Sequence, residues 1–386
     1  MGKKRGAGEG SITQRKDGLW QGAVTIGRTE HGGQCRKYFY GKTRAEVSKK
    51  ITEALKELNE GSWINSATSP SISQWMNSWL FTYKRHNLKQ TTFEQYETLL
   101  RKHLYPALGD VKISELTADK LQLLYNKMKN DGLSAKTIRT LNVVLHAGLK
   151  QAIWNGLINK NITEQIALPR REISEMRVLS KEEQERLFEV LYDDRMGGAI
   201  IFSLLSGVRR GELLSLKWSD IDWDKRLVHI RRTVNRVKNY DIKASRKTKL
   251  VISETKTAKS RRIIPIIDYL YEILIKQKEK QDEEKMLAGD LYEDNDLVFA
   301  TEMGRIIDPG NYNRTLSRIS KRAGVAHVNP HSLRHTFATR CLESGIDLKV
   351  LQELMGHSSI TVTGDVYAHV MVDRKIEEMK KLNNIM

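Results

Sequence analysis

Five short segments in the second half of the chain hold side chains that could act together on a phosphodiester. They are Arg209 in Gly207–Leu213, Lys256 in Glu254–Thr257, the run His331–Arg334, His357 in Leu354–Ser358, and Tyr367 in Asp365–His369. Singly, each has a commoner structural explanation, such as a salt bridge for an arginine near a glutamate. His331 and His335 are four residues apart and could bind a metal, but no glutamate lies between them and Arg334 would repel a cation.

Together, these side chains suit one reaction class, phosphoryl transfer through a covalent intermediate. Two arginines from separate segments can bind a phosphodiester through paired hydrogen bonds, and histidines can add donors or carry a proton. A lysine can protonate the leaving alkoxide, and a tyrosine hydroxyl can attack phosphorus. The sequence holds no Walker loop, no carboxylate cluster and no zinc-ligand spacing. We therefore expect no metal or other cofactor, with cationic side chains stabilising the transition state.

The order Arg, Lys, His-x-x-Arg, His, Tyr resembles that of the tyrosine recombinases, the phage integrase family. The similarity is greatest to integrases of conjugative transposons and temperate phages, and it extends over the whole chain. All six positions are present and in order. The resemblance implies a site-specific DNA recombinase that cleaves and rejoins strands through a 3′-phosphotyrosine, and so integrates and excises a mobile element.

The resemblance also implies a role for each residue around the phosphate. Arg209 and Arg334 would hold the scissile phosphate. His331 would bind the phosphate or move a proton, and His357 would donate to the phosphate or to the attacking oxygen. Glu212 would orient Arg209 without taking part in the chemistry. Two neighbours of these positions are weaker candidates for catalysis: Arg210 and His335.

The lysine and the tyrosine complete the set that the resemblance implies. Lys256 would be the general acid for the 5′-hydroxyl, and Tyr367 would be the nucleophile. Lys259, Arg261 and Arg262 compete with Lys256 for the lysine position, or for contact with DNA. Thr-Lys-Thr directly before a strand is the better match, so we favour Lys256.

The elements that must position these residues fall into three parts, which predict a multidomain α+β fold. Residues 1–64 are basic and contain three strand-like runs and a helix, which resembles an arm-type DNA-binding domain; protein docking is the alternative. Residues 70–162 have helical periodicity throughout and resemble the core-binding domain. The aromatic residues of its first helix, Trp75, Trp79 and Tyr83, are expected to lie in the core. The runs in the first part are Ser11–Arg15, Leu19–Ile26 and Arg36–Tyr40, with a helix from Thr43.

The third part, 179–386, follows a linker at 163–178 and resembles the catalytic domain. A capped helix is expected from Ser180 with Glu183, and an apolar helix over Ala199–Leu205. Strands are expected at Leu227–Ile230 and Arg262–Ile266, which predicts a mainly helical domain with a small antiparallel sheet. A short amphipathic tail helix ends the chain, and it would pack either on its own subunit or on a neighbouring one.

The net charge indicates the partner. Lys and Arg number 65 against 47 Asp and Glu, a formal net charge of +18, which favours double-stranded DNA. The segment Arg231–Lys249 holds eight Lys/Arg and one Asp, and we expect a hairpin or loop that contacts phosphates. The basic residues that we expect at DNA are Arg231, Arg232, Arg236, Lys238, Lys259, Arg261, Arg170 and Arg171.

The remaining features concern compartment and assembly. No apolar stretch approaches the roughly 20 residues that span a bilayer, and the first residues lack the apolar region of a secretory signal. With only two cysteines, we expect free thiols and a place in the bacterial cytoplasm. The resemblance implies core and arm sites on DNA, a homotetramer, no membrane partner and an accessory protein for excision. The alternatives are a topoisomerase-like nicking and closing enzyme, or a catalytically silent DNA-binding regulator.

Overall fold

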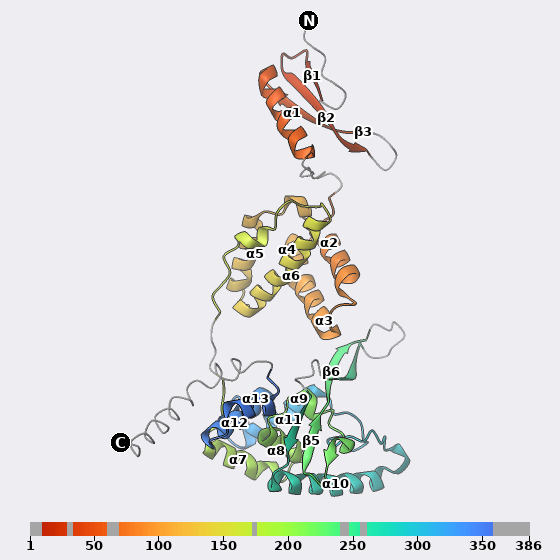
Figure 1. The fold of residues 1–386 in the computed structure, drawn as a ribbon, viewed down its shortest axis with the longest axis vertical. Coiled ribbons are helices and arrows are strands. Elements are labelled where there is room, and N and C mark those ends of the chain that lie inside the picture. Colours follow the sequence, from red (N-terminus) through yellow and green to blue (C-terminus); the bar gives the residue numbers. More distant parts are fainter. Residues whose placement is uncertain are drawn as a thin grey trace, which may run out of the picture. The chain divides into compact units, whose positions relative to one another are not determined.

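The computed structural model describes residues 10–28, 34–59, 69–171, 176–239, 247–254 and 261–357. The chain divides into two compact units, Met1–Ile173 and Ser174–Met386 (Figure 1). The described residues combine helices with small antiparallel sheets, which confirms the predicted α+β class. Within these residues, no helix combines the length and the apolar character needed to cross a membrane.

The first unit begins with a three-stranded antiparallel sheet that a helix covers on one face. This arrangement confirms the predicted strands and helix. Gly18, at φ +82°, forms the turn between the first two strands. Gly22 is required by close packing, since a Cβ there would lie 2.5 Å from a side-chain carbon of Ile51 on the helix. The elements are β1 (Ser11–Gln14), β2 (Trp20–Arg28), β3 (Gln34–Gly41) and α1 (Arg44–Asn59), with strand order β1-β2-β3.

The rest of the first unit is a helical bundle, as predicted. Side-chain caps mark the starts of three of its helices: Ser71 accepts from Gln74 N, Thr117 from Lys120 N, and Ser134 from Thr137 N. The α-helices are α2 (Ile72–Ser78), α3 (Gln90–Leu99), α4 (Tyr105–Leu108), α5 (Ala118–Asn130) and α6 (Ala135–Trp154). Short helices of other types are the π-helices η1 (Trp79–Lys84) and η2 (Leu100–Leu104) and the 3₁₀-helices η3 (Ile113–Glu115) and η4 (Ile162–Gln165).

The bundle core is apolar and well connected. Trp79 is fully buried and Trp75 is 6% exposed, so both are core residues, as expected. The indole of Trp75 donates from Nε1 to the Gly148 carbonyl of α6 at 3.0 Å. Tyr125 of α5 donates its hydroxyl hydrogen to Asn142 Oδ1 of α6 at 3.1 Å. This bond joins the two longest helices of the bundle across a buried interface.

The chain after α6 remains attached to the bundle. Gln122 of α5 exchanges two hydrogen bonds with the backbone of Ala167, at 2.9 and 3.2 Å. Arg139 of α6 donates from Nε to the Pro169 carbonyl at 2.8 Å. The first part of the predicted linker, 163–178, is therefore hydrogen-bonded to the first unit.

The second unit carries most of the chemistry-bearing residues. Its helices are α7 (Lys181–Leu191), α8 (Gly197–Ser206), α9 (Arg210–Leu213), α10 (Asp268–Ala288), α11 (Pro309–Arg322), α12 (Pro330–Glu343) and α13 (Leu348–Met355), with short 3₁₀ turns η5 (Trp218–Asp220) and η7 (Gly289–Leu291). Its strands are β4 (Ile221–Asp222), β5 (Leu227–Ile230), β6 (Arg232–Lys238), β7 (Thr248–Glu254) and β8 (Arg262–Pro265), in one sheet of order β4-β5-β8 and one hairpin β6-β7.

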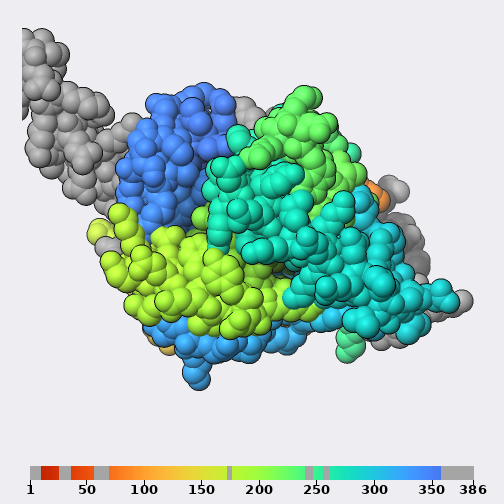
Figure 2. Space-filling view, turned by 90° about the horizontal axis from the view of Figure 1, so that it is seen from below, coloured from red at the N-terminus to blue at the C-terminus, as the bar shows by residue number. Residues whose placement is uncertain are grey.

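Helix α8 lies at the centre of the second unit. Eight of its ten residues are buried, and the predicted apolar helix at Ala199–Leu205 is thereby confirmed. Helix α7 begins at the predicted capping box of Ser180 and Glu183. Figure 2 shows α7 (yellow-green) beside α10 (teal) on one face of this unit. The basic segment after β5 is a hairpin as far as the structure describes it, because β6 and β7 pair from Arg232–Glu254 to Lys238–Thr248.

We predict that the buried bond between Tyr125 and Asn142 stabilises the bundle. Replacing Tyr125 by Phe should lower the free energy of opening of α5 and α6 by about 1–2 kcal/mol, because the Asn142 amide loses its partner while still desolvated. Native-state hydrogen exchange on α5 and α6 peptides of the full chain measures this loss. The double variant Tyr125→Phe/Asn142→Leu should recover part of it. Protection unchanged in Tyr125→Phe would contradict the prediction.

Candidate active site

The turn between α8 and α9 positions the first arginine of the site. Gly207 ends α8 at φ +62°, and a Cβ there would lie 2.3 Å from the Phe337 ring of α12, so both the backbone angle and the space require glycine. Arg209 then stands at the N-cap of α9. Its backbone N–H donates to Glu212 Oε2 and its Nη1 to Glu212 Oε1, both at 2.9 Å. Glu212 therefore holds both the backbone and the guanidinium of Arg209.

Glu212 is a buried carboxylate between two guanidinium groups. It is 4% exposed, and it accepts from Arg209 Nη1 and, at 2.8 Å, from Arg262 Nη2 of β8. Burial by itself would raise the pKa of the Glu212 carboxyl. The charges and hydrogen bonds of Arg262 and then Arg209 outweigh that effect and hold the pKa below its usual value. Glu212 is thus an anion at neutral pH.

Three arginines donate to consecutive carbonyl groups at the end of α13. Arg262 Nε donates to the Leu354 carbonyl at 2.6 Å, Arg334 Nη2 to that of Met355, and Arg209 Nη2 to that of Gly356 at 3.1 Å. These carbonyls lie at the helix end, where intrahelical partners run out and the helix dipole is negative. His357 follows directly, and its carbonyl accepts from Gln352 Nε2 at 3.1 Å. The arginines therefore fix the backbone that directly precedes His357.

Helix α12 carries the His-x-x-Arg motif. Asn329 caps it, with Oδ1 accepting from the backbone N–H groups of His331 (2.9 Å) and Ser332 (3.1 Å). Arg334 is 4% exposed and also donates from Nη1 to the Gly207 carbonyl. It therefore ties the end of α8 to the end of α13. His331 lies about one turn before Arg334, and its ring centroid is 6.5 Å from that of His335.

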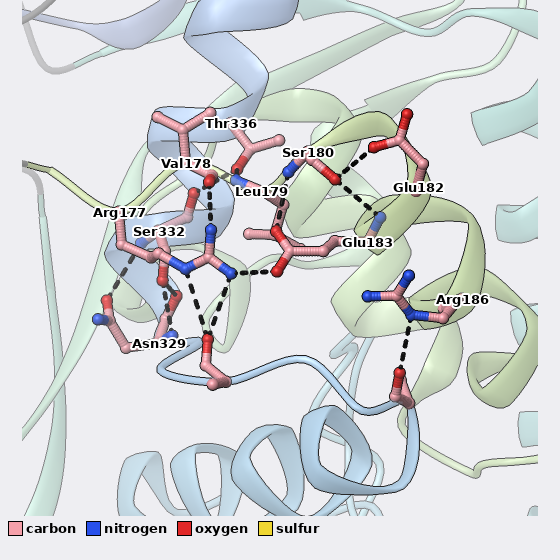
Figure 3. Close-up of polar contacts among 12 residues, drawn as sticks. Arg177, Val178, Leu179, Ser180, Glu182, Glu183, Arg186, Asn329, Ser332 and Thr336 are labelled. Atoms are coloured by element: carbon pink, nitrogen blue, oxygen red, sulfur yellow. Dashed lines mark hydrogen bonds and ion pairs between the residues drawn. The ribbon is translucent and has the colours of Figure 1, made fainter.

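A second set of polar contacts anchors α12 to the start of the unit (Figure 3). Thr336 of α12 accepts at Oγ1 from the backbone N–H of Leu179 at 2.9 Å. Arg177 donates to the Val178 carbonyl and to Glu183 Oε1, both at 2.6 Å. The chain entering the unit is thus bonded to the same helix that carries His331 and Arg334.

Burial and the arginines together set the protonation of the nearby histidines. Burial, and then the charges of Arg334 and Arg209, lower the pKa of His357 to about 4. Burial, followed by His331 and Arg334, lowers the pKa of His335 to about 4. Burial, then Arg334 and Arg210, lowers the pKa of His331. All three imidazoles are therefore neutral at pH 7, held in a field of positive charge.

The comparisons with known proteins agree with this geometry. Residues 177–374 match the phage integrase family, and residues 71–129 match its N-terminal SAM-like domain. A tyrosine recombinase XerC-like protein of Caldanaerobacter subterraneus is 36% identical over 94% of this chain and 95% of its own length. The chain belongs to the phage integrase family. It is a tyrosine-type site-specific DNA recombinase, which confirms the function that the motif order predicted.

Further relatives and structures extend the likeness of this recombinase. The transposase from transposon Tn916 of Enterococcus faecalis is 26% identical over 78% of this chain and 76% of its own. A structure of the Tn1549 transposon integrase with circular intermediate DNA is 25% identical, with a TM-score of 0.66, and covers 81% of this chain and 99% of that one. A lambda integrase tetramer on a Holliday junction shares the fold, with a TM-score of 0.57, 20% identity, and 94% of this chain and 96% of that one covered.

The structure brings together four of the predicted site residues in the recombinase. Arg209, Glu212, Arg334 and His357 meet through the contacts above, and His331 lies on the same helix as Arg334. Lys256 and Tyr367 lie outside the described residues. Sequence reasoning missed the place of Arg262, which was weighed only for the lysine position or DNA contact. The signal was available in β8, whose alternating burial places Arg262 on the inner face with Ile264.

The basic residues that we expected at DNA have varied environments. Arg170 and Arg171 are exposed near the end of the first unit, Lys238 ends β6, and Lys259 lies outside the described residues. Arg232 is bound at 2.6 Å to the buried Asp220 and is 26% exposed, so it is the least available to a phosphate. Exposed ion pairs contribute little to stability, so a phosphate could replace the acidic partner of each of the other arginines. The pairs are Arg231 and Arg232 with Asp220, Arg236 with Asp308, and Arg261 with Glu254.

We predict that the recombinase without DNA loses stability in acid as its site histidines take up protons. The unfolded chain binds these protons near pH 6.5 and the folded chain near pH 4 for His335 and His357, so stability falls as pH drops through that window. NMR titration of the histidine rings should give midpoints near 4 for both residues. Spectra of His335→Gln and His357→Gln identify the signals. Midpoints at or above 6.5 would contradict the prediction.

Proposed function

We propose that this recombinase cleaves DNA with Tyr367 while Arg209, Arg334 and His357 hold the scissile phosphate. The observation that carries the proposal is the convergence of two motif arginines and the motif histidine at the end of α13, from segments about 125 residues apart in the case of the arginines. Glu212 pairs with two of the three guanidinium groups at this helix end, so the site has an excess of positive charge. An anion such as a phosphodiester is the complementary ligand.

The proposed chemistry divides into an attack and its reversal. The Tyr367 hydroxyl attacks phosphorus, the bond to the 5′-oxygen breaks, and a 3′-phosphotyrosine forms. Lys256 gives a proton to the leaving 5′-oxygen, and such acid catalysis contributes about 10²–10⁴-fold. A 5′-hydroxyl of the partner strand then attacks the phosphotyrosine and releases Tyr367. His331 would accept the proton that Tyr367 loses or bind the phosphate, since burial and then the surrounding arginines lower its pKa and keep its imidazole neutral.

The arginines act on the charge of the transition state. Arg209 is 37% exposed on its side chain, so part of its five-donor guanidinium faces solvent after its bonds to Glu212 and Gly356. Arg334 is buried, so its charge is little screened by salt. His357 lines a cavity of about 590 Å³ beside β8, together with Arg261 and Lys349. Ready-placed donors of this kind are the main means by which enzymes stabilise developing negative charge.

We also propose the biological setting of the reaction, integration and excision of a mobile element in the bacterial cytoplasm. Similarity to the Tn916 transposase and to the Tn1549 integrase, solved with circular intermediate DNA, supports it. In this proposal residues 1–64 bind arm sites through the sheet, while 70–162 and 179–386 bind the core site, joined by the linker 163–178. The exposed Tyr38 and Tyr40 on the sheet support a DNA-contacting face. An accessory protein would direct excision.

We predict a covalent DNA complex that depends on Tyr367. A nicked suicide substrate built from the ends of the element should give an SDS-resistant protein–DNA band with the wild type, also in EDTA. Tyr367→Phe should bind the same DNA but give no band, because the nucleophilic oxygen is removed.

Each other result has a distinct meaning. A band that survives Tyr367→Phe would show that another residue is the nucleophile. Tight binding without a band from the wild type would favour the silent regulator. Strict dependence on a divalent metal would contradict the metal-independent mechanism. Relaxation of supercoiled DNA without any strand-exchange product would favour the nicking and closing enzyme.

We predict that the complex active in recombination contains four copies of the chain, two of which cleave at a time. Similarity of fold to the lambda integrase tetramer supports this assembly. Tyr367→Phe, incubated with two core sites, should accumulate a complex whose mass equals four chains and two duplexes, measured by light scattering. A recombining complex with fewer than four chains would contradict the prediction, whereas a monomer without DNA would not.

A further inference from the structure

Arg262 lies at the junction of the elements that form the site. Its side chain is 5% exposed. Its Nη2 donates to Glu212 Oε2 at 2.8 Å, and its Nε donates to the Leu354 carbonyl at 2.6 Å. Its Nη1 is buried and has no hydrogen-bond partner among the described residues. The guanidinium is thus used to join two protein segments and is enclosed by them.

The two segments that Arg262 joins are those that hold the proposed phosphate-binding residues. Glu212 holds Arg209 in place by accepting two hydrogen bonds from it. Leu354 is in the last turn of α13, three residues before His357. Because a guanidinium is a rigid planar fork, bonds from Nε and Nη2 fix the distance and angle between the carboxylate and the carbonyl. Arg262 therefore fixes the position of Arg209 relative to His357.

Charge gives Arg262 a second effect on the same residues. The charged groups bonded to Glu212 are Arg209 on its own turn and Arg262 of β8. Arg334 of α12 and His357 after α13 are the other charged or titratable groups at this end of α13. Arg232 on the adjacent β6 is bound to Asp220 instead. Among these groups Arg262 does most to offset the burial of Glu212 and to keep its pKa low. Loss of Arg262 would leave a buried carboxylate with one partner, and its pKa would rise.

We propose that Arg262 is a positioning residue of the recombinase site, which holds Glu212 and the end of α13 so that Arg209 and His357 meet the phosphate together. The inference rests on the proposed function, in which Arg209 and His357 bind the scissile phosphate. Arg262 itself acts through these neighbours and does not touch the DNA. Its sequence neighbour Arg261 is 57% exposed and pairs with Glu254, so the two adjacent arginines have different tasks.

The test compares two substitutions of Arg262 with a matched control. Arg262→Gln removes the charge and the fork, whereas Arg262→Lys keeps the charge. Arg195 offers the control, since it also joins a carboxylate to a carbonyl: it donates to Glu284 at 2.7 and 2.8 Å and to the Ala300 carbonyl at 2.9 Å. The measurements are the single-turnover cleavage rate of the suicide substrate against pH and the affinity for the same DNA.

We expect Arg262→Gln to cleave about 10²-fold more slowly at pH 7 with unchanged DNA affinity, since small misplacements of reacting groups cost that much. Its rate should also fall at higher pH than in the wild type, because Glu212 then takes up a proton and releases Arg209. Arg262→Lys should restore the pH profile but only part of the rate, because an ammonium lacks the planar fork. Arg195→Gln should keep the wild-type pH profile.

A further variant distinguishes the titration of Glu212 from that of His357. The low pKa of His357 also depends in small part on Arg262. In the double variant Glu212→Gln/Arg262→Gln, the shifted fall of the cleavage rate on the acid side of the pH profile (the acid limb) should vanish, because residue 212 no longer titrates. A limb that stays would assign it to His357 and overturn the role of Glu212.

A wild-type rate and pH profile in Arg262→Gln would overturn the inference. Equal losses of cleavage rate in Arg262→Gln and Arg195→Gln, without a change of pH profile, would also overturn it. If Arg262→Gln does not fold, the profile and rate of Arg262→Lys decide, and full activity there overturns it. These results differ from failure of the proposed function, in which the wild type itself gives no Tyr367-dependent covalent product.

Discussion

The C-terminal end of α13 is held by three guanidinium groups, and the rest of the site depends on that contact. A helix end leaves carbonyl groups without partners and carries the negative end of the helix dipole. Arg262, Arg334 and Arg209 donate to three of these carbonyls in succession. The buried carboxylate of Glu212 pairs with two of them, Arg209 and Arg262. In the proposed function, the site is therefore complementary to an anion before any DNA binds.

This arrangement has a cost that the surrounding fold must offset. Guanidinium groups and a carboxylate lose water when they are buried, and the loss is repaid only with good geometry and complete hydrogen bonding. The geometry comes from rigid parts: the left-handed Gly207 against Phe337, the Asn329 cap of α12, and the alternation of β8. Arg334 also bonds to the Gly207 carbonyl, so the ends of α8 and α13 share one side chain. The arginines thus serve as structural bonds, and in the proposed function they are also the ligands for phosphate.

Burial, together with the same cations, explains why the site histidines stay neutral. Burial and positive neighbours lower the pKa of His357 to about 4, so at neutral pH it can donate one hydrogen and accept another. A bound phosphodiester would bring negative charge next to these rings and raise their pKa. In the proposed function, proton transfer at the site would therefore be coupled to DNA binding. The link between Leu179 and Thr336 adds a connection from the entry of the second unit to the helix that carries the motif.

Much of this protein could be predicted from residue types and their order. The six motif positions indicated the reaction class and family, and local signals such as the Ser180–Glu183 box and the apolar run at Ala199–Leu205 predicted their helices. Such features depend on residues close in the chain. The tertiary structure alone decided which arginine does what. Arg261 and Arg262 are equivalent in the sequence, but strand alternation exposes one and buries the other. The partners of Arg262 lie 50 and 92 residues away, at distances that no local pattern can encode.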